Sequence, residues 1–285
     1  MNIFSSQNSL KKEFYHLWKK FTIFFVFIFF FGFLFANAYI SEIKSGEIKE
    51  TSLINDNPND FSNAFFIIIY ILFITALILF LSRKFSLRWL IVLLEIFLLF
   101  ISVFLLLSLF IGASAFYFAF LFVLLRRILP ENTLLKNIGA MASISVVGVF
   151  LGVSLGIGPM LLLLIALAIY DLIAVFKTKH MVSLAKIFKK ENSAFTLTLL
   201  ANLTNKLKKQ NPLPKKTFEL GSGDLVIPLA FSVSLLKNNL PNKAFLIPVF
   251  AYIGISLTIW FALKYKKPLP ALPLQTLLML LAFLL

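Results

Sequence analysis

Long apolar runs, separated by short polar and basic segments, form the dominant pattern along this chain. Most of the runs reach the roughly 20 residues that a helix needs to cross a bilayer. The nine runs cover residues 21–40, 61–81, 89–111, 114–129, 134–155, 157–176, 220–236, 244–263 and 270–285. The pattern therefore predicts an all-α, polytopic membrane protein with nine transmembrane helices.

The apolar pattern predicts one membrane-embedded domain over residues 1–285. Residues 1–156 hold the first five helices, and residues 157–285 hold helices six to nine with a long basic loop at 177–219. Within that loop, segments 181–190 and 194–209 have apolar residues at helical spacing beside lysines, which favours helices lying on the membrane surface.

The basic residues are concentrated in alternate loops. With the N-terminus in the cytoplasm, 23 of the 27 Lys and Arg residues fall on the cytoplasmic side. The positive-inside rule thus predicts a cytoplasmic N-terminus, an outside C-terminus and a cytoplasmic 177–219 loop. The net charge of +15 is spread over many loops rather than one patch, so no nucleic-acid partner is expected.

The first apolar run allows two interpretations. It ends in Ala36-Asn37-Ala38, which resembles a signal-peptidase site. A retained helix is favoured over a cleaved signal peptide, because the basic segment and the apolar run are both long for a signal.

The residue types exclude several kinds of site. The chain has no cysteine and only two histidines, His16 and His180, which both lie outside the apolar runs. Disulfides, thiolate catalysis and cysteine-ligated metals are excluded, and a histidine-rich metal site is not expected. We expect the protein to use neither a metal nor another cofactor.

Two aspartates lie inside apolar runs, where charged groups are costly and mark function by default. Asp171 is near the end of the sixth run, and Asp224 is near the start of the seventh. In the predicted topology both lie roughly 9–12 Å from the cytoplasmic boundary, at 1.5 Å per helical residue. Because the two helices run antiparallel, their carboxylates share a depth.

Two neighbouring carboxylates in a low dielectric do not both ionise easily. Such a pair suits peptide hydrolysis, in which one carboxylate activates water and the other donates a proton. Which aspartate is the acid and which the base stays open. The alternatives are a structural carboxylate pair, or a cation leak channel or proton-coupled carrier that also uses Glu95.

The residues around Asp224 favour hydrolysis. Gly221 and Gly223 permit close approach of a substrate backbone. Pro228 has no N–H to donate to the Asp224 carbonyl, which loosens the helix there. The prolines of Leu269-Pro270-Ala271-Leu272-Pro273 keep the start of the ninth run irregular, so its backbone is predicted to pair with an unwound substrate.

Three motifs together resemble the presenilin and signal peptide peptidase family of intramembrane aspartyl proteases. They are Tyr170-Asp171, Gly221-Ser222-Gly223-Asp224 and Pro270-Ala271-Leu272, each on the expected run. The resemblance covers about 157–274, and earlier residues match only in helix number and orientation. Lys177 to Met181 looks most similar to archaeal presenilin homologues.

The resemblance implies an intramembrane endopeptidase that cleaves transmembrane segments near their cytoplasmic ends. It implies Asp171 and Asp224 as the catalytic pair, and substrate contacts from the remaining motif residues: Tyr170, Gly221, Ser222, Gly223, Pro270, Ala271 and Leu272. The 177–219 loop is shorter than in animal presenilins, which puts autocleavage there in doubt. We expect a multi-pass protein of an archaeal cell membrane.

The natural substrate stays open, as does homo-oligomerisation. Because the outer loop at 41–60 is too small to be a docking domain, activity without obligatory partner subunits is expected. A prepilin-peptidase-like enzyme also carries Gly-x-Gly-Asp, but it lacks Pro-Ala-Leu, and a purely structural scaffold is a further alternative.

Glu95 and a row of glycines have structural interpretations. Glu95 either lines an ion or proton path, or bonds a neighbouring helix or reaches toward Arg88; the structural alternatives are favoured. Gly148, Gly152 and Gly156 recur every four residues, which predicts a small-residue face for close helix packing.

Overall fold

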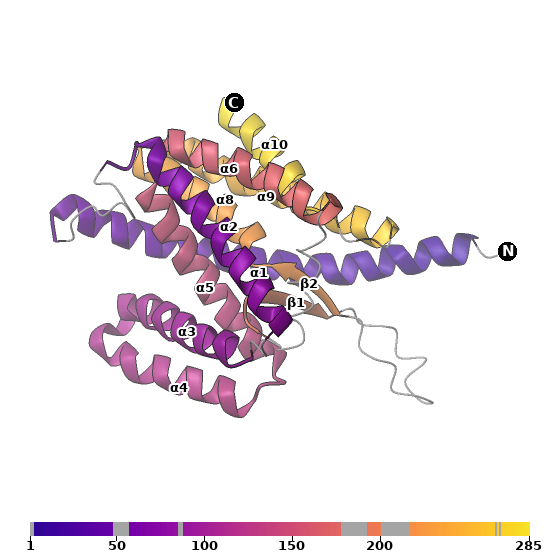
Figure 1. The fold of residues 1–285 in the computed structure, drawn as a ribbon, viewed down its shortest axis with the longest axis horizontal. Coiled ribbons are helices and arrows are strands. Elements are labelled where there is room, and N and C mark those ends of the chain that lie inside the picture. The colour runs from indigo at the N-terminus through magenta and orange to yellow at the C-terminus, as the bar shows by residue number, and fades with distance from the viewer. Residues whose placement is uncertain are drawn as a thin grey trace.

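The computed structural model describes residues 3–47, 57–84, 88–177, 193–200, 217–265, 267 and 269–285, and these are mostly helical (Figure 1). The helices are α1 (Ile3–Ser45), α2 (Phe61–Lys84), α3 (Arg88–Ile111), α4 (Ala115–Ile128), α5 (Thr133–Ser154), α6 (Ile157–Leu172), α8 (Gly223–Lys237), α9 (Pro241–Tyr265) and α10 (Leu272–Leu284). A short 3₁₀ turn, η1 (Gly112–Ser114), follows α3, and a π-helical turn, η2 (Ile173–Lys177), follows α6.

Six helical stretches in the described residues are long and apolar enough to cross a membrane. They are Phe14–Ser45, Phe61–Ser82, Arg88–Ile128, Thr133–Ser154, Ile157–Lys177 and Pro241–Tyr265, and α10 is a shorter apolar helix. The protein is therefore an integral, multi-pass membrane protein. The count of nine spans and their orientation stay predictions.

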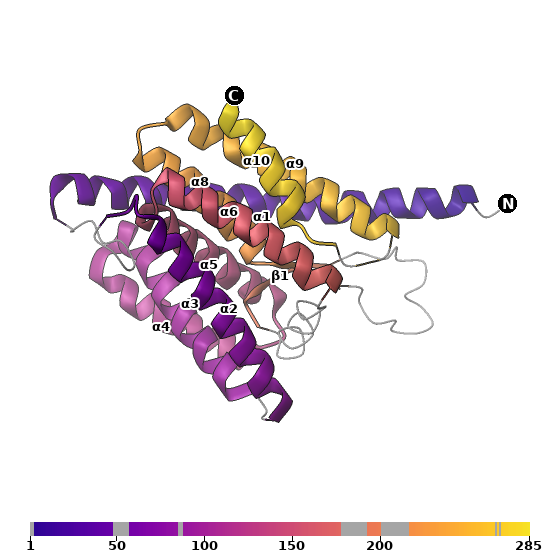
Figure 2. The ribbon, with the colours of Figure 1, turned by 45° about the horizontal axis from the view of Figure 1, so that its top comes forward.

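The stretch Arg88–Ile128 is a hairpin rather than one straight helix. Helices α3 and α4 lie side by side and are joined at η1 (Figures 1 and 2). Gly112 opens the turn with φ of +57°, in the left-handed region that glycine adopts without a Cβ clash.

Helix α1 extends along the length of the molecule (Figures 1 and 2). Its 43 residues span about 65 Å at 1.5 Å per residue. It continues unbroken through Ala36-Asn37-Ala38 and packs against α5, α8 and α9. The side chains of Phe21, Ile28 and Ala36 are fully buried in these contacts.

Helix α8 is the most enclosed helix near the predicted site, since nearly all of its residues from Leu225 to Leu235 are buried. Close packing on α5 depends on the predicted glycine face. A Cβ at Gly148 would lie 2.8 Å from Leu229, and one at Gly152 would overlap the Ala230 carbonyl oxygen. The packing interpretation of these two glycines is confirmed.

A two-stranded antiparallel sheet precedes α8, and it corrects the expected all-α fold locally. Strand β1 (Thr196–Leu200) pairs with β2 (Thr217–Gly221), with Thr196 opposite Gly221. The predicted surface helix at 194–209 is therefore wrong over β1, where Thr-Leu-Thr-Leu alternates with a period of two. Because β2 includes Leu220 and Gly221, α8 begins later than the seventh apolar run.

The second predicted surface helix, 181–190, lies outside the described residues. The two largest apolar clusters of the described residues join both halves of the chain. One core brings residues of α1 and α5 together with α8, α9 and the sheet, and the other brings α2 and α6 together with α8, α9 and α10. Asp171 and Asp224 lie at the edge of this second cluster, which includes Leu167 of α6, Ile227 of α8 and Leu272 of α10.

Candidate active site

Asp171 and Asp224 come from facing helix ends. Asp171 is in the last turn of α6 and is 4% exposed, and Asp224 is in the first turn of α8 and is partly buried. Although 53 residues separate them in the chain, the two carboxyl groups are close enough to interact electrostatically. The fold thus brings together the two acids that the sequence placed at one depth.

The Pro-Ala-Leu segment contacts Asp171 through backbone amides. The N–H of Leu272 donates to Asp171 Oδ2 at 3.2 Å, and the N–H of Ala271 also faces this carboxyl group. These amides lie at the start of α10, where the first-turn N–H groups have no partner within the helix and the helix dipole favours negative charge. Ala271 and Leu272 are buried, and Pro270 is partly buried.

A residue that the sequence analysis missed contacts Asp224. Gln275, one turn further along α10, donates its Nε2 to the Asp224 carbonyl oxygen at 2.9 Å. This carbonyl is the one that Pro228 leaves without an intrahelical donor. The signal in the sequence was the proline itself, which predicted a carbonyl in need of a partner but gave no means of finding it.

The glycines on either side of Ser222 face different surroundings. A Cβ at Gly221 would lie 3.4 Å from Asp224 Oδ2, whereas one at Gly223 would meet nothing within 4 Å. Both glycines are exposed, and Ser222 is partly buried. Open space beside Asp224 is therefore on the side of Gly223.

The sheet fixes the chain that enters α8. Strand β2 leads directly into the helix, and the N–H of Ser222 donates to the Phe195 carbonyl oxygen at 3.3 Å. Asn137 of α5, which is 5% exposed, bonds both backbone groups of Thr198, at 3.0 and 2.9 Å. The outer edge of β1 is thereby occupied at Thr198.

Tyr170 lies on the side of α6 that faces α2. Its side chain is partly buried and hydrogen-bonds Thr75 of α2. The π-helical turn η2 begins two residues after Asp171. Such turns recur at functional sites because they widen the helix locally.

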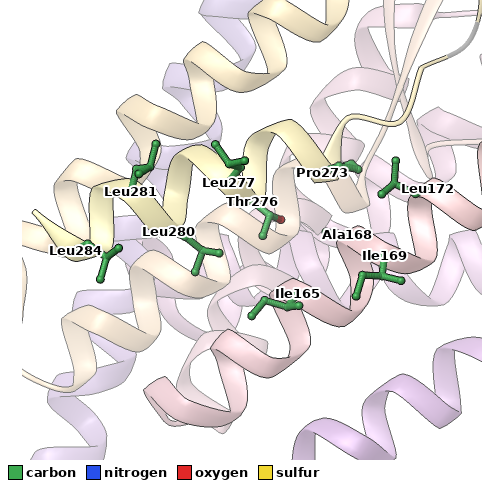
Figure 3. A pocket seen from close by; sticks show the side chains of 10 residues that line it. All are labelled: Ile165, Ala168, Ile169, Leu172, Pro273, Thr276, Leu277, Leu280, Leu281 and Leu284. Carbon is green, nitrogen blue, oxygen red and sulfur yellow. The ribbon is translucent and has the colours of Figure 1, made fainter.

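An apolar groove of about 330 Å³ runs between α6 and α10 (Figure 3). Ile165 of α6 faces Thr276 and Leu280 of α10 across it. Thr276 is the polar side chain among the residues that line it. The groove ends beside Leu172 and Pro273, which directly follow Asp171 and Leu272 in the chain.

Glu95 lies apart from this site, in the α3–α4 hairpin. It is 2% exposed and forms ion pairs with Arg126 at 3.3 Å and Arg127 at 3.1 Å. Bonding to a neighbouring helix, one of the two structural alternatives, is what the structure shows. Over the described ranges, no group of three or more His, Asp or Glu residues is arranged to hold a metal ion.

Comparison with known proteins agrees with this geometry. A family profile described as "Signal-peptide peptidase, presenilin aspartyl protease" matches residues 28–276. The chain belongs to this family of aspartyl proteases. As a member of the signal peptide peptidase and presenilin family, it is an aspartic-type endopeptidase that cleaves within membranes.

Solved structures support the same fold. Two crystal forms described as a presenilin family intramembrane aspartate protease superpose with TM-scores of 0.61 and 0.62, each at 21% sequence identity. The alignments cover 90% and 92% of this chain and 93% and 96% of the other chains. No curated protein matches the sequence. The arrangement of the helices is therefore similar to that of the presenilin-family protease, although the sequence identity is low.

Proposed function

We propose that Asp171 and Asp224 form the catalytic dyad with which this protease hydrolyses peptide bonds in transmembrane segments. The observation that carries the proposal is that the start of α10 bonds both aspartates, the Asp171 side chain through Leu272 and the Asp224 backbone through Gln275. The backbone of α10 supports it, because the N–H groups of Leu272 and Ala271 hold the Asp171 carboxyl group at the end of α6, beside the start of α8.

The reaction needs one ionised and one protonated aspartate. The ionised carboxylate takes a proton from water, and the resulting hydroxide adds to the scissile carbonyl carbon. The protonated carboxyl group hydrogen-bonds the oxyanion that forms. Collapse of the tetrahedral intermediate breaks the C–N bond as a proton moves to the leaving nitrogen, so that the dyad again holds one proton.

The α6–α10 groove is suited to an apolar substrate helix. Its lining is almost wholly aliphatic, and it opens at the surface of the helix bundle and ends beside the dyad. A transmembrane segment lying there would reach Asp171 and Asp224 at one end only. We infer that cleavage takes place near that end, which is cytoplasmic in the predicted topology.

The unwound part of the substrate needs hydrogen-bond partners. The sheet is the best-placed source, because β2 leads directly into Asp224 and strand addition satisfies an extended backbone. Asn137 occupies the outer edge of β1, which favours the outer edge of β2, where no further strand pairs among the described residues. The sequence analysis predicted that the 269–273 backbone pairs with the unwound substrate. In the structure, two amides of this segment, those of Ala271 and Leu272, face Asp171.

Cleavage of a defined substrate tests the dyad. Purified protein in liposomes is given a peptide with one transmembrane segment, and product masses are read directly. Asp171→Asn and Asp224→Asn are each expected to lower kcat by about 100- to 10,000-fold, the usual contribution of a general acid or base. Unfolding midpoints should stay at or above that of wild type, and cleavage that survives either change would refute the dyad.

A cation channel or proton-coupled carrier is the alternative use of these acids. It loses support because Glu95 is bound by two arginines rather than facing a path. Flux measured in the same liposomes separates the two functions. Flux that depends on Asp171 and Asp224 without peptide cleavage would favour the carrier.

We further propose that the single domain of residues 1–285 works without obligatory partner subunits, in an archaeal cell membrane. The shared apolar cores between the two halves support one domain. Activity of the purified protein in liposomes tests independence from partners, and light scattering of the same sample reports whether it forms a homo-oligomer.

A further inference from the structure

Gln275 binds the backbone of Asp224 from the opposite side of a helix interface. We propose that it is a positioning residue for proteolysis, which replaces the hydrogen bond that Pro228 removes from α8 and so holds Asp224 at the right place relative to Asp171. The inference rests on the proposed dyad, since it assigns Gln275 a role through Asp224.

The Asp224 carbonyl needs a donor from outside its own helix. In a regular helix it would accept from the N–H four residues later, but that residue is Pro228, which has no N–H. A carbonyl can only accept, so the amide nitrogen of Gln275 has to face it, at 2.9 Å. Gln275 therefore supplies the missing donor.

The first turn of α10 contacts both aspartates. Leu272 donates to the Asp171 side chain, and Gln275, three residues later on the same helix face, donates to the Asp224 backbone. The two acids are thus attached to one rigid turn. The distance between them follows from the fixed spacing of Leu272 and Gln275.

The backbone of Gln275 is itself held closely. Gly254 of α9 packs against it, so that a Cβ at Gly254 would lie 2.8 Å from the Gln275 Cα and 3.2 Å from its nitrogen. Because a helix this tightly packed cannot shift freely, the Gln275 side chain starts from a fixed position. This is the arrangement that a positioning residue requires.

Stability alone does not account for a glutamine here. The side chain is fully buried, and its Oε1 has no hydrogen-bond partner among the described residues. An unpaired buried acceptor is costly, and an apolar residue of the same length would avoid it. The amide is retained at a site where packing by itself would favour methionine.

A double-mutant cycle between Gln275 and Pro228 tests the inference. Gln275→Met removes the donor and keeps the volume. Pro228→Ala restores an N–H that can serve the Asp224 carbonyl within α8. Met279→Leu is the matched control, because Met279 is also fully buried and lies one turn further along α10. For each variant, kcat, KM and the unfolding midpoint are measured in liposomes with the same peptide.

We expect Gln275→Met to lower kcat by about 10- to 100-fold with KM nearly unchanged, because a small misplacement of a reacting group has this effect. In the Pro228→Ala background the same change should cost less than about 3-fold, since the carbonyl then has its own donor. Met279→Leu should stay close to wild type. An equal loss in both backgrounds, or no loss in either, would overturn the proposal.

The test still decides the question if one of the variants folds poorly. If Gln275→Met alone does not fold, an active double variant supports the proposal and a misfolded or inactive one overturns it. If Pro228→Ala is itself inactive, the cycle is measured with unfolding midpoints. Because the Gln275 amide and the restored N–H would share the Asp224 carbonyl, Gln275→Met should again cost less in the Pro228→Ala background. Asp224→Asn is measured alongside, because its activity would refute the dyad whatever the cycle shows.

Discussion

The α3–α4 hairpin and the α6–α8–α10 interface each bury acidic groups inside the membrane domain, but they treat them differently. In the hairpin, Glu95 forms ion pairs with Arg126 and Arg127. At the interface, no Lys, Arg or His of the described residues forms an ion pair with Asp171 or Asp224. Asp171 instead accepts from the backbone of α10.

The difference separates a structural acid from a chemical one. A carboxylate held by two guanidinium groups has its lone pairs occupied by fixed donors. A carboxyl group beside a second acid, with only backbone donors, keeps the capacity to exchange a proton. All three acids are thus at least partly buried in the membrane domain, where a charge is costly. Their hydrogen-bond and ion-pair partners decide whether each acid is structural or can exchange a proton.

The largest effect in this comparison should come from Glu95, where a substitution should lower stability but not activity. Glu95→Gln leaves two arginines without their anion, so we expect the free energy of unfolding to fall by about 3 kcal/mol or more while kcat of the remaining folded protein is kept. Thermal unfolding in detergent and cleavage per folded molecule measure both quantities. Loss of kcat with unchanged stability would place Glu95 in the chemistry instead.

A paired replacement sharpens the same test. Replacing both members of a buried ion pair by apolar residues is often neutral, since no charge is left unpaired. In Glu95→Leu with Arg126→Met only Arg127 loses its partner, and its side chain is 30% exposed, so this double variant should recover most of the stability that Glu95→Gln loses. A double variant as unstable as the single one would show that the ion pair with Arg127, rather than the buried pair with Arg126, carries the stability.

The next largest effect on stability is expected at Gly152, where α5 packs closely against α8. The Cβ added by Gly152→Ala would overlap the backbone of Ala230, which cannot move as a side-chain tip can. We expect a loss of about 1 to 3 kcal/mol, as for other overpacked cores. The unfolding midpoint measures it, and a wild-type midpoint would mean that α5 and α8 pack less closely than described.

Gly254→Ala should affect stability and catalysis together. The added Cβ presses on the backbone of Gln275 and displaces α10 from α9. We expect kcat to fall about 10-fold, because the contacts of α10 with both aspartates shift. Activity and unfolding are measured on one sample, and a stability loss with unchanged kcat per folded molecule would disconnect α10 from the site.

The smallest stability effect is expected in the Gly-x-Gly-Asp motif, beside the proposed catalytic Asp224. Gly223→Ala adds a methyl group that meets no protein atom within 4 Å, so the unfolding free energy should change by only about 0.5 kcal/mol. If the substrate uses that space, kcat/KM falls about 10-fold. Unchanged kcat/KM would show that the substrate approaches Asp224 from another side.

Much of the site was predictable because its residues break local rules. Acids in apolar runs, glycines beside one of them and prolines at the start of another run marked Asp171, Asp224 and the segment 270–272 without a structure. The family match confirms the protease function inferred from these motifs. The roles of the individual site residues remain predictions that the variants above test.

The local errors also have physical causes. The apolar spacing of residues 194–209 beside lysines predicts a surface helix, but residues 196–200 form strand β1. The strand forms because β2 supplies partners for its backbone and Asn137 bonds its outer edge. Strand formation depends on such distant partners, which a single segment of sequence does not contain.

The sequence by itself determined that this chain lies in a membrane, that it carries two acids within apolar runs, and that Pro228 deprives one carbonyl of its donor. These follow from hydropathy, periodicity and covalent chemistry, which are local. Only the tertiary structure decided which groups compensate: arginines for Glu95, Leu272 for Asp171 and Gln275 for the Asp224 carbonyl. Hydrogen bonds between helices depend on atomic positions fixed by packing, and no residue pattern along one chain specifies them.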